Sequence, residues 1–420
     1  MSRLLASYAA IAVLLSSLAT AETQVNVRTS GAQTGAAIAT DPRGGAVVVW
    51  SSYYSTGGRS NDILARRLDA AGAPTGDEFP VNAINQGNQT ETTVAIDGLG
   101  NLAVVWQSPG PEEDILMRMY DPQRIPITGD LLVNLRTNGR QLYPCVAAGG
   151  EGVFLVAWES RETTVYGDQT FLCAQRFDPN GAGVGDEILV DPDIYDCRSP
   201  DAAMDAQGNF VVTWMRDRSS HPIMARLFDP NGVPRTDPFA VNTTGSASVT
   251  RPSVAMNAQG WFVITWDGDP NRAADDDIHA RLYDPNGVAR GEPFMANAIR
   301  SGAQQWPQVA IGDSNEFVIV WECDTGDPNA GVDIYARRFT PDGAPVGEET
   351  RLNTYTLDKQ RYADVAMTAD GSFIAVWESN NQDGSGYGIF AHAERRAAPV
   401  DPNASDRKST RLNSSHESPS

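Results

Sequence analysis

The stretch Phe210-Val211-Val212-Thr213-Trp214 is one copy of a short apolar run that ends in tryptophan and occurs seven times along the chain. The tryptophans that end these runs follow one another at intervals of 52 to 56 residues. They are Trp50, Trp106, Trp158, Trp214, Trp266, Trp321 and Trp377. A repeat of about fifty residues that contains several strands is typical of a β-propeller. The sequence therefore predicts an all-β, seven-bladed β-propeller.

The fourth repeat shows the composition of one blade. Residues 200–204, 210–214, 223–228 and 239–242 are short, largely apolar runs separated by segments rich in turn residues. Four such runs predict a four-stranded antiparallel sheet. Apolar residues occupy both faces of the second run, as expected for a sheet that is covered on both sides by neighbouring blades. A single repeat cannot bury itself in this way, so the repeats are expected to stack in a ring.

The ring is expected to close through the beginning of the chain. The seventh repeat ends after residues 388–393 without a fourth strand, whereas each of the other repeats ends in a Val-Asn pair or a close variant of it. Gln24-Val25-Asn26 supplies the missing copy. We therefore predict that an N-terminal strand completes the last blade, which removes an exposed sheet edge.

The two ends of the sequence differ from the repeats. Residues 1–21 combine a positive start, an apolar stretch and a small-residue cleavage pattern, and they predict a secretory signal peptide. The propeller is expected to span residues 22–396. Residues 406–416 resemble a translated sequencing adapter, so we interpret 406–420 as an artefact and 397–405 as a linker or the start of a lost C-terminal region.

The balance of charge excludes two kinds of partner. The formal net charge is −21, from 53 acidic and 32 basic residues. Nucleic acids and anionic membranes require a basic face, so the charge argues against both. No apolar stretch after the signal peptide is long enough to span a bilayer. We expect a monomeric propeller that is secreted to the extracellular space or the periplasm.

Four cysteines allow three disulfide connectivities in an oxidising compartment. They are Cys145, Cys173, Cys197 and Cys323, and the first three fall within about one repeat. This clustering favours a local bridge between Cys173 and Cys197. No pair of cysteines has the spacing of a zinc or redox motif.

The repeat unit resembles one found in secreted bacterial surface proteins, often beside calcium-binding repeat domains. The segments 333–339 (Asp-Ile-Tyr-Ala-Arg-Arg-Phe) and 380–387 (Asn-Asn-Gln-Asp-Gly-Ser-Gly-Tyr) look most like it, and the likeness extends over residues 24–396. The resemblance implies a surface or extracellular role and brings no catalytic residues with it.

The loops that differ between repeats predict where a site lies. The connections from the second to the third strand, and from the fourth strand to the next blade, vary in length and emerge at the same end of the blades. Variable loops on a rigid scaffold commonly carry binding residues. We therefore expect a site on this face, near the mouth of the central channel.

The fifth repeat contains the best candidate for a metal site. Asp267, Asp269, Asn271 and Asp275 present oxygen ligands at close intervals, which suits a hard cation such as Ca2+. The segment departs from the EF-hand pattern, because Arg272 stands in place of the loop glycine. A solvated loop in an acidic protein is the alternative interpretation.

A recurring arginine and a recurring aspartate mark the third strand of most repeats. We interpret them as inter-blade ion pairs and hydrogen bonds, with an arginine-lined anion site as the alternative. The arginines are Arg66, Arg118, Arg226, Arg281 and Arg337, and the aspartates are Asp62, Asp114, Asp277 and Asp333.

Aromatic residues outside the tryptophan repeat predict a ligand rim. The repeat tryptophans lie on second strands, so we expect them to pack between blades. Trp306 lies on the variable face, and together with Tyr53, Tyr54, Tyr166 and Tyr387 it can form an aromatic rim for a ligand.

Three functions remain open from these observations. The first is a secreted, non-catalytic propeller that binds a protein or a glycan through its variable-loop face, with calcium as a stabilising ion. The second is an extracellular polysaccharide hydrolase or lyase, which would gather several acids, an arginine and an aromatic residue around one pocket. The third is a structural spacer within a longer surface protein. Because the sequence has few histidines and no Gly-x-Ser-x-Gly motif, we favour the first.

Overall fold

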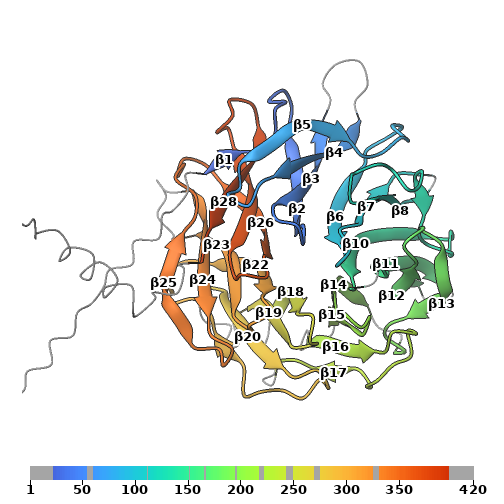
Figure 1. Cartoon of the computed structure of the whole chain (residues 1–420). Helices are drawn as coiled ribbons and strands as arrows, with labels where there is room; N and C mark the ends of the chain where they lie inside the picture. The colour runs from blue at the N-terminus through green and yellow to red at the C-terminus, as the bar shows by residue number, and fades with distance from the viewer. Residues whose placement is uncertain are drawn as a thin grey trace, which may run out of the picture.

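In a computed structural model the chain forms a ring of seven four-stranded antiparallel sheets (Figure 1). The first strands of neighbouring sheets contact one another around the ring and surround its centre. The predicted seven-bladed β-propeller is therefore confirmed. The structure describes residues 22–53, 60–110, 112–150, 152–164, 167–193, 196–216, 222–242, 249–268, 275–324 and 331–396.

The strands of each blade follow one another from the channel outward. Blade 1 is β2 (Gln33–Thr40), β3 (Ala46–Tyr53), β4 (Asn61–Leu68) and β5 (Pro74–Pro80); blade 2 is β6 (Thr90–Ile96), β7 (Leu102–Ser108), β8 (Asp114–Tyr120) and β9 (Leu131–Leu132); blade 3 is β10 (Arg140–Ala148), β11 (Phe154–Thr164), β12 (Gly167–Phe177) and β13 (Gly183–Leu189). Blade 4 is β14 (Cys197–Met204), β15 (Phe210–Arg216), β16 (Ile223–Phe228) and β17 (Phe239–Ala240); blade 5 is β18 (Val249–Met256), β19 (Phe262–Gly268), β20 (Asp277–Tyr283) and β21 (Phe294–Met295); blade 6 is β22 (Gln304–Ile311), β23 (Phe317–Asp324), β24 (Val332–Phe339) and β25 (Pro345–Arg351). Blade 7 is β26 (Gln360–Met367), β27 (Phe373–Asn380), β28 (Tyr387–Glu394) and, outermost, β1 (Thr23–Gln24).

Blade 7 closes the ring as predicted, with β1 from the start of the chain paired antiparallel to β28. Thr23 lies opposite Ala391, and the Val25 N–H donates to the carbonyl of Ile389 at 2.7 Å. The side chain of Val25 is fully buried. Closure therefore combines backbone pairing with apolar packing.

Blade 4 shows where the expected strand boundaries differ. The first strand begins at Cys197, before the expected run, because pairing continues across a bulge between Arg198 and Asp201. The fourth strand ends at β17 before its Val-Asn pair. The Asn242 side chain instead accepts a hydrogen bond from the Ile223 N–H at 2.9 Å, so this asparagine ties the strands together through its side chain.

The repeat tryptophans pack between blades, as expected. Trp50 of blade 1, for example, lies in a buried apolar cluster with Val376 and Ile389 of blade 7. In five blades the indole N–H donates to a glutamine side chain that lies seventeen residues earlier, at 2.9–3.2 Å. These glutamines are Gln33, Gln89, Gln141, Gln304 and Gln360. A buried indole is thus satisfied without reaching the channel.

The recurring arginines join adjacent blades, but not through ion pairs with the recurring aspartates. Each arginine donates from Nη1 to a backbone carbonyl of the preceding blade at 2.6–2.9 Å, as Arg281 does to Val241. The aspartates instead accept from the Val-Asn asparagine of their own blade, as Asp277 does from Asn297 at 2.7 Å. The inter-blade interpretation holds for the arginines and was wrong for the aspartates.

All four cysteines are buried and free, so the expected Cys173–Cys197 bridge was wrong. The two thiols belong to different blade interfaces: Cys173 packs between blades 2 and 3, and Cys197 packs between blades 3 and 4. The Cys197 thiol also lies 3.3 Å from the Asp191 carboxylate.

The described part of the chain contains no helix long and apolar enough to cross a membrane.

A candidate functional site at the channel mouth

Each innermost strand carries one residue with a positive φ angle near the variable-loop end of the blade. The residues are Gly35 (65°), Glu91 (49°), Tyr143 (50°), Ser199 (52°), Arg251 (51°), Trp306 (56°) and Tyr362 (50°). In blades 6 and 7 the register of the first strand shifts there, which marks a β-bulge. A bulge turns a side chain out of the regular ladder, and bulges are common beside functional sites. The fold thus places seven unusual residues around one channel mouth.

A polar side chain directly after the repeat tryptophan supports the bulge of the next blade. The Glu322 Oε1 accepts from the Tyr362 N–H at 2.7 Å, and the Asp267 Oδ2 accepts from the Trp306 N–H at 3.0 Å. Glu159 and Glu378 hold the bulges of blades 4 and 1 in the same way. Sequence reasoning missed this role, although the acid that follows the tryptophan in four repeats was a visible signal.

Arginines neutralise most of these carboxylates. Arg251 pairs with Asp267 at 2.8 Å, and Arg361 pairs with Glu378 at 2.9 Å. Glu159 is likewise paired with an arginine of its own blade. Glu322 makes no ion pair with any described residue. It is therefore the one acid of this group whose charge is not directly compensated within the described part of the chain.

Aromatic rings and guanidinium groups form a compact cluster beside this acid. The rings of Trp306 and Tyr362 meet edge to face with centroids 4.8 Å apart. The Arg251 guanidinium lies 3.9 Å from the Trp306 ring, and that of Arg361 lies 3.7 Å from the Tyr387 ring. Cation–π contacts of this kind hold planar groups in fixed positions. The aromatic surface is therefore preorganised.

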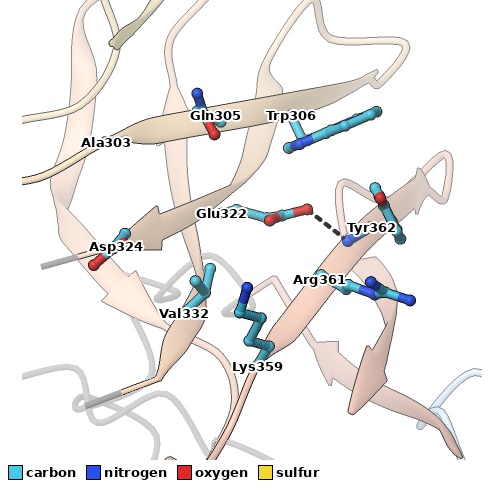
Figure 2. Close-up of a pocket in the computed structure, with 9 residues that line it drawn as sticks. All are labelled: Ala303, Gln305, Trp306, Glu322, Asp324, Val332, Lys359, Arg361 and Tyr362. Atoms are coloured by element: carbon cyan, nitrogen blue, oxygen red, sulfur yellow. Dashed lines mark hydrogen bonds between the residues drawn. The ribbon is translucent and has the colours of Figure 1, made fainter. Parts of the chain in front are cut away.

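A pocket of about 280 Å³ opens between blades 6 and 7 at this cluster (Figure 2). It is lined by Ala303, Gln305, Trp306, Glu322, Asp324, Val332, Lys359, Arg361 and Tyr362. Figure 2 shows the Glu322 carboxylate between the Trp306 ring and the backbone of Tyr362. The pocket combines apolar ring surface with carboxylate, amide and ammonium groups.

Burial changes the protonation of the acids at the mouth. It raises the pKa of Glu322 to about 7, because the hydrogen bond from the Tyr362 N–H and the charges of Arg251 and Arg361 only partly offset the loss of hydration. Burial also raises the pKa values of Asp267 and Glu378, and their arginine partners oppose it. Glu322 can therefore exchange a proton near neutral pH.

Two further carboxylates, Asp201 and Asp364, lie on the innermost strands β14 and β26. Burial raises the pKa of Asp201 to about 7 and that of Asp364 to about 6. Each accepts a backbone hydrogen bond from the next blade: Asp201 from Val254 at 2.7 Å and Asp364 from Ile38 at 2.8 Å. These aspartates therefore connect neighbouring first strands.

The structure joins two of the five predicted rim residues to the pocket cluster. Trp306 lines the pocket, and Tyr387 touches it through Arg361. Tyr53 ends β3 in blade 1 and makes no ring contact with the others among the described residues. Tyr54 and Tyr166 lie outside the described residues. The rim as a ligand site stays a prediction. The predicted set of aromatic residues did not include Tyr362, which lines the pocket.

The predicted calcium site is only partly described. Asp267 is buried and accepts hydrogen bonds from Thr250, Arg251 and Trp306, whereas Asp275 is exposed. Asp269 and Asn271 lie outside the described residues. In the described part of the chain no group of three His, Cys, Asp or Glu side chains could hold a metal ion. Calcium binding stays a prediction.

No protein-family profile and no curated protein sequence matches the chain. Several solved structures share the fold. An ulvan lyase, a polysaccharide lyase, is 10% identical with a TM-score of 0.57, over 89% of this chain and 95% of that one. A Penicillium chrysogenum α-L-arabinanase complexed with arabinobiose is 12% identical with a TM-score of 0.50, over 72% and 92%. A protein of unknown function from Dyadobacter fermentans is 12% identical with a TM-score of 0.51, over 90% and 99%. At these identities the likeness shows the fold alone.

Proposed function

We propose that this propeller binds a glycan in the pocket between blades 6 and 7. The observation that carries the proposal is the edge-to-face pair of Trp306 and Tyr362 beside Glu322, which makes no direct ion pair with a described residue. The apolar face of a sugar ring packs well on an aromatic side chain. Its hydroxyl groups would then donate to Glu322, exchange hydrogen bonds with Gln305 and accept from the Lys359 ammonium group.

The size and rigidity of the site agree with this proposal. The pocket volume of about 280 Å³ is near the lower end of the roughly 300–1,000 Å³ that is usual for ligand pockets, which suits a short segment of a longer glycan. The cation–π contacts of Arg251 with Trp306 and of Arg361 with Tyr362 order the rings before a ligand arrives, so less conformational entropy is lost on binding. Two proteins that share the fold, an arabinanase complexed with arabinobiose and an ulvan lyase, act on glycans, so a saccharide is the natural first ligand to test.

A polysaccharide hydrolase or lyase is the second candidate, and Glu322 is the observation that favours it. An acid with a pKa of about 7 in a pocket can donate or accept a proton at neutral pH. Arg361 and the aromatic pair lie beside it, so the pocket gathers the groups expected of an enzyme. Binding and catalysis would use the same pocket and differ in whether a glycosidic bond breaks.

The experiment is calorimetry and affinity electrophoresis of the full chain with soluble glycans, including arabinan and ulvan. We expect saturable binding that Trp306→Ala weakens about tenfold, which corresponds to about 1.4 kcal/mol, the scale of one aromatic contact. Trp261→Ala is the matched control. Trp261 lies directly before β19, and its ring contacts Arg290, away from the pocket. This substitution should leave binding unchanged.

The same samples separate the two candidates. Release of reducing ends or unsaturated sugars that Glu322→Gln abolishes would assign an enzyme. Binding without product assigns a binding protein. If no glycan binds, or if Trp306→Ala and Trp261→Ala behave alike, the proposed pocket is wrong.

A further inference from the structure

A second group of arginines surrounds a pocket of about 340 Å³ between blades 1 and 2. Arg67 comes from β4, Arg118 from β8, and Arg124 from the turn that follows β8. This turn connects a third strand to a fourth one and therefore lies at the end of the blades opposite the channel-mouth pocket. In an acidic chain such a grouping of cations calls for an explanation.

Blade 6 shows a contact that an arginine at the Arg67 position can make. In blade 6 the equivalent Arg338 donates from Nη1 to the carbonyl of Gly371 in the next blade at 2.7 Å. In blade 2 the equivalent carbonyl, that of Gly100, is already bound by Nη1 of Arg124 at 2.8 Å. Arg67 accordingly has no hydrogen-bond or ion-pair partner among the described residues, although it is half-buried.

The Asp41 carboxylate that contacts Arg124 forms no ion pair with Arg67 among the described residues. Asp41 is shared between Arg124, at 2.7 Å, and Arg43, at 2.9 Å. Burial lowers the pKa of Arg124 to about 10; Asp41 opposes this shift, and the charge of Arg67 adds to it. Two guanidinium groups are thus held close together against their mutual repulsion.

The guanidinium groups also retain free donors. The Nε atoms of Arg118 and Arg124 are buried and have no hydrogen-bond partner among the described residues. Arg118 is paired with Asp130 at 3.5 Å, and the Asp77 that lines the pocket is exposed. Buried donors without acceptors are unfavourable.

We propose that the pocket formed by Arg67, Arg118 and Arg124 binds an oxyanion, either sulfate or phosphate as the free ion or the sulfate ester of a saccharide. Guanidinium groups bind such oxyanions through paired, charge-assisted hydrogen bonds. A bound oxyanion would compensate Arg67 and relieve its repulsion with Arg124. The site is separate from the glycan pocket, so neither proposal depends on the other.

The test is calorimetry and thermal unfolding of the full chain with sodium sulfate, sodium phosphate and sodium chloride at constant ionic strength. We expect saturable sulfate or phosphate binding that Arg67→Gln weakens at least about tenfold, a change that corresponds to about 1.4 kcal/mol. Arg300→Gln is the matched control, because Arg300 is exposed in another blade. It also measures the general stabilisation that sulfate gives to any protein.

A sulfated oligosaccharide and its unsulfated counterpart distinguish the sources of the anion. Binding of the inorganic ions alone supports a small-anion site. Binding of the sulfated sugar as well, lost in Arg67→Gln but kept in Arg300→Gln, supports a sulfated glycan. The proposal is overturned if no ion binds saturably, or if Arg67→Gln and Arg300→Gln respond equally.

Discussion

Replacing the channel aspartate Asp201 with asparagine should stabilise the propeller at alkaline pH and have less effect at acidic pH. Burial raises the pKa of Asp201 from 3.8 to about 7, so the folded state favours the protonated acid. Ionisation at higher pH must then be forced on the folded protein. The free energy of unfolding is therefore lowered progressively as the pH rises from about 4 to about 7. Asparagine has no charge and removes this loss.

The magnitude follows from the size of the shift. A shift of about three units at about 1.4 kcal/mol per unit lowers the stability by roughly 4 kcal/mol above pH 7. Asp201 accepts hydrogen bonds from the backbone of Val254 and Ala202. Asparagine keeps only one carbonyl acceptor, so the substitution loses about one hydrogen bond, which lowers the gain by roughly 1 kcal/mol. The net gain at pH 8 is thus roughly 3 kcal/mol. The hydrogen-bond contribution is similar at every pH, so the gain should be about 2–3 kcal/mol larger at pH 8 than at pH 5.

The assay is urea unfolding of wild type and Asp201→Asn at pH 5 and pH 8, with Asp313→Asn as the control for an exposed aspartate. The charge of Asp364 helps to raise the pKa of Asp201, so Asp364→Asn should reduce the effect of the Asp201 substitution. An Asp201→Asn effect that is equal at the two pH values would refute the argument that a buried charge in the channel destabilises the ring.

Two other predictions concern closure and metal. Asn26→Ala removes the acceptor of the Ile389 N–H at 2.7 Å and leaves that buried donor unsatisfied, so it should lower the free energy of unfolding by about 2–3 kcal/mol. The exposed Val27→Ala should have little effect, and a loss below about 0.5 kcal/mol for Asn26→Ala would contradict the closure argument. If calcium binds the fifth repeat, a chelator should lower the melting temperature, excess calcium should restore it, and Asp275→Asn should reduce the difference. An unchanged melting temperature in scanning calorimetry would rule out the predicted calcium site.

The repeat pattern predicts the fold because each blade solves the same packing problem. The regular spacing of the repeat tryptophans, from Trp50 to Trp377, indicates one sheet per repeat. The extra Val25-Asn26 copy at the start of the chain indicates how the ring closes. Both signals are local in sequence, since every repeat must bury a similar apolar face. The strand boundaries were less predictable, because bulges and the Asn242 side chain end the ladders through contacts that composition does not reveal.

The pocket was harder to predict because its residues belong to different blades. Trp306 could be singled out from its position before a proline, but Tyr362 and Glu322 become a site only when blades 6 and 7 are adjacent. The pKa of Glu322 likewise depends on burial by a neighbouring blade. The metal prediction rested on oxygen spacing alone, and spacing does not show that Asp267 already accepts three protein donors.

Both proposed sites lie where one blade lacks a contact that another blade makes. In blades 5 and 7 an arginine at or next to the bulge pairs with the carboxylate that follows the tryptophan. Blade 6 has Gln305 and Trp306 at those positions, and Glu322 makes no direct ion pair with a described residue. In blade 2, Arg124 takes the carbonyl that would otherwise satisfy Arg67. A repeat protein can retain such unsatisfied charge because the other blade junctions supply the stability of the ring. Restoring the pattern at blade 6 with Gln305→Arg should therefore stabilise the fold and impair binding, which is the opposite of what a purely structural origin of the pocket would give.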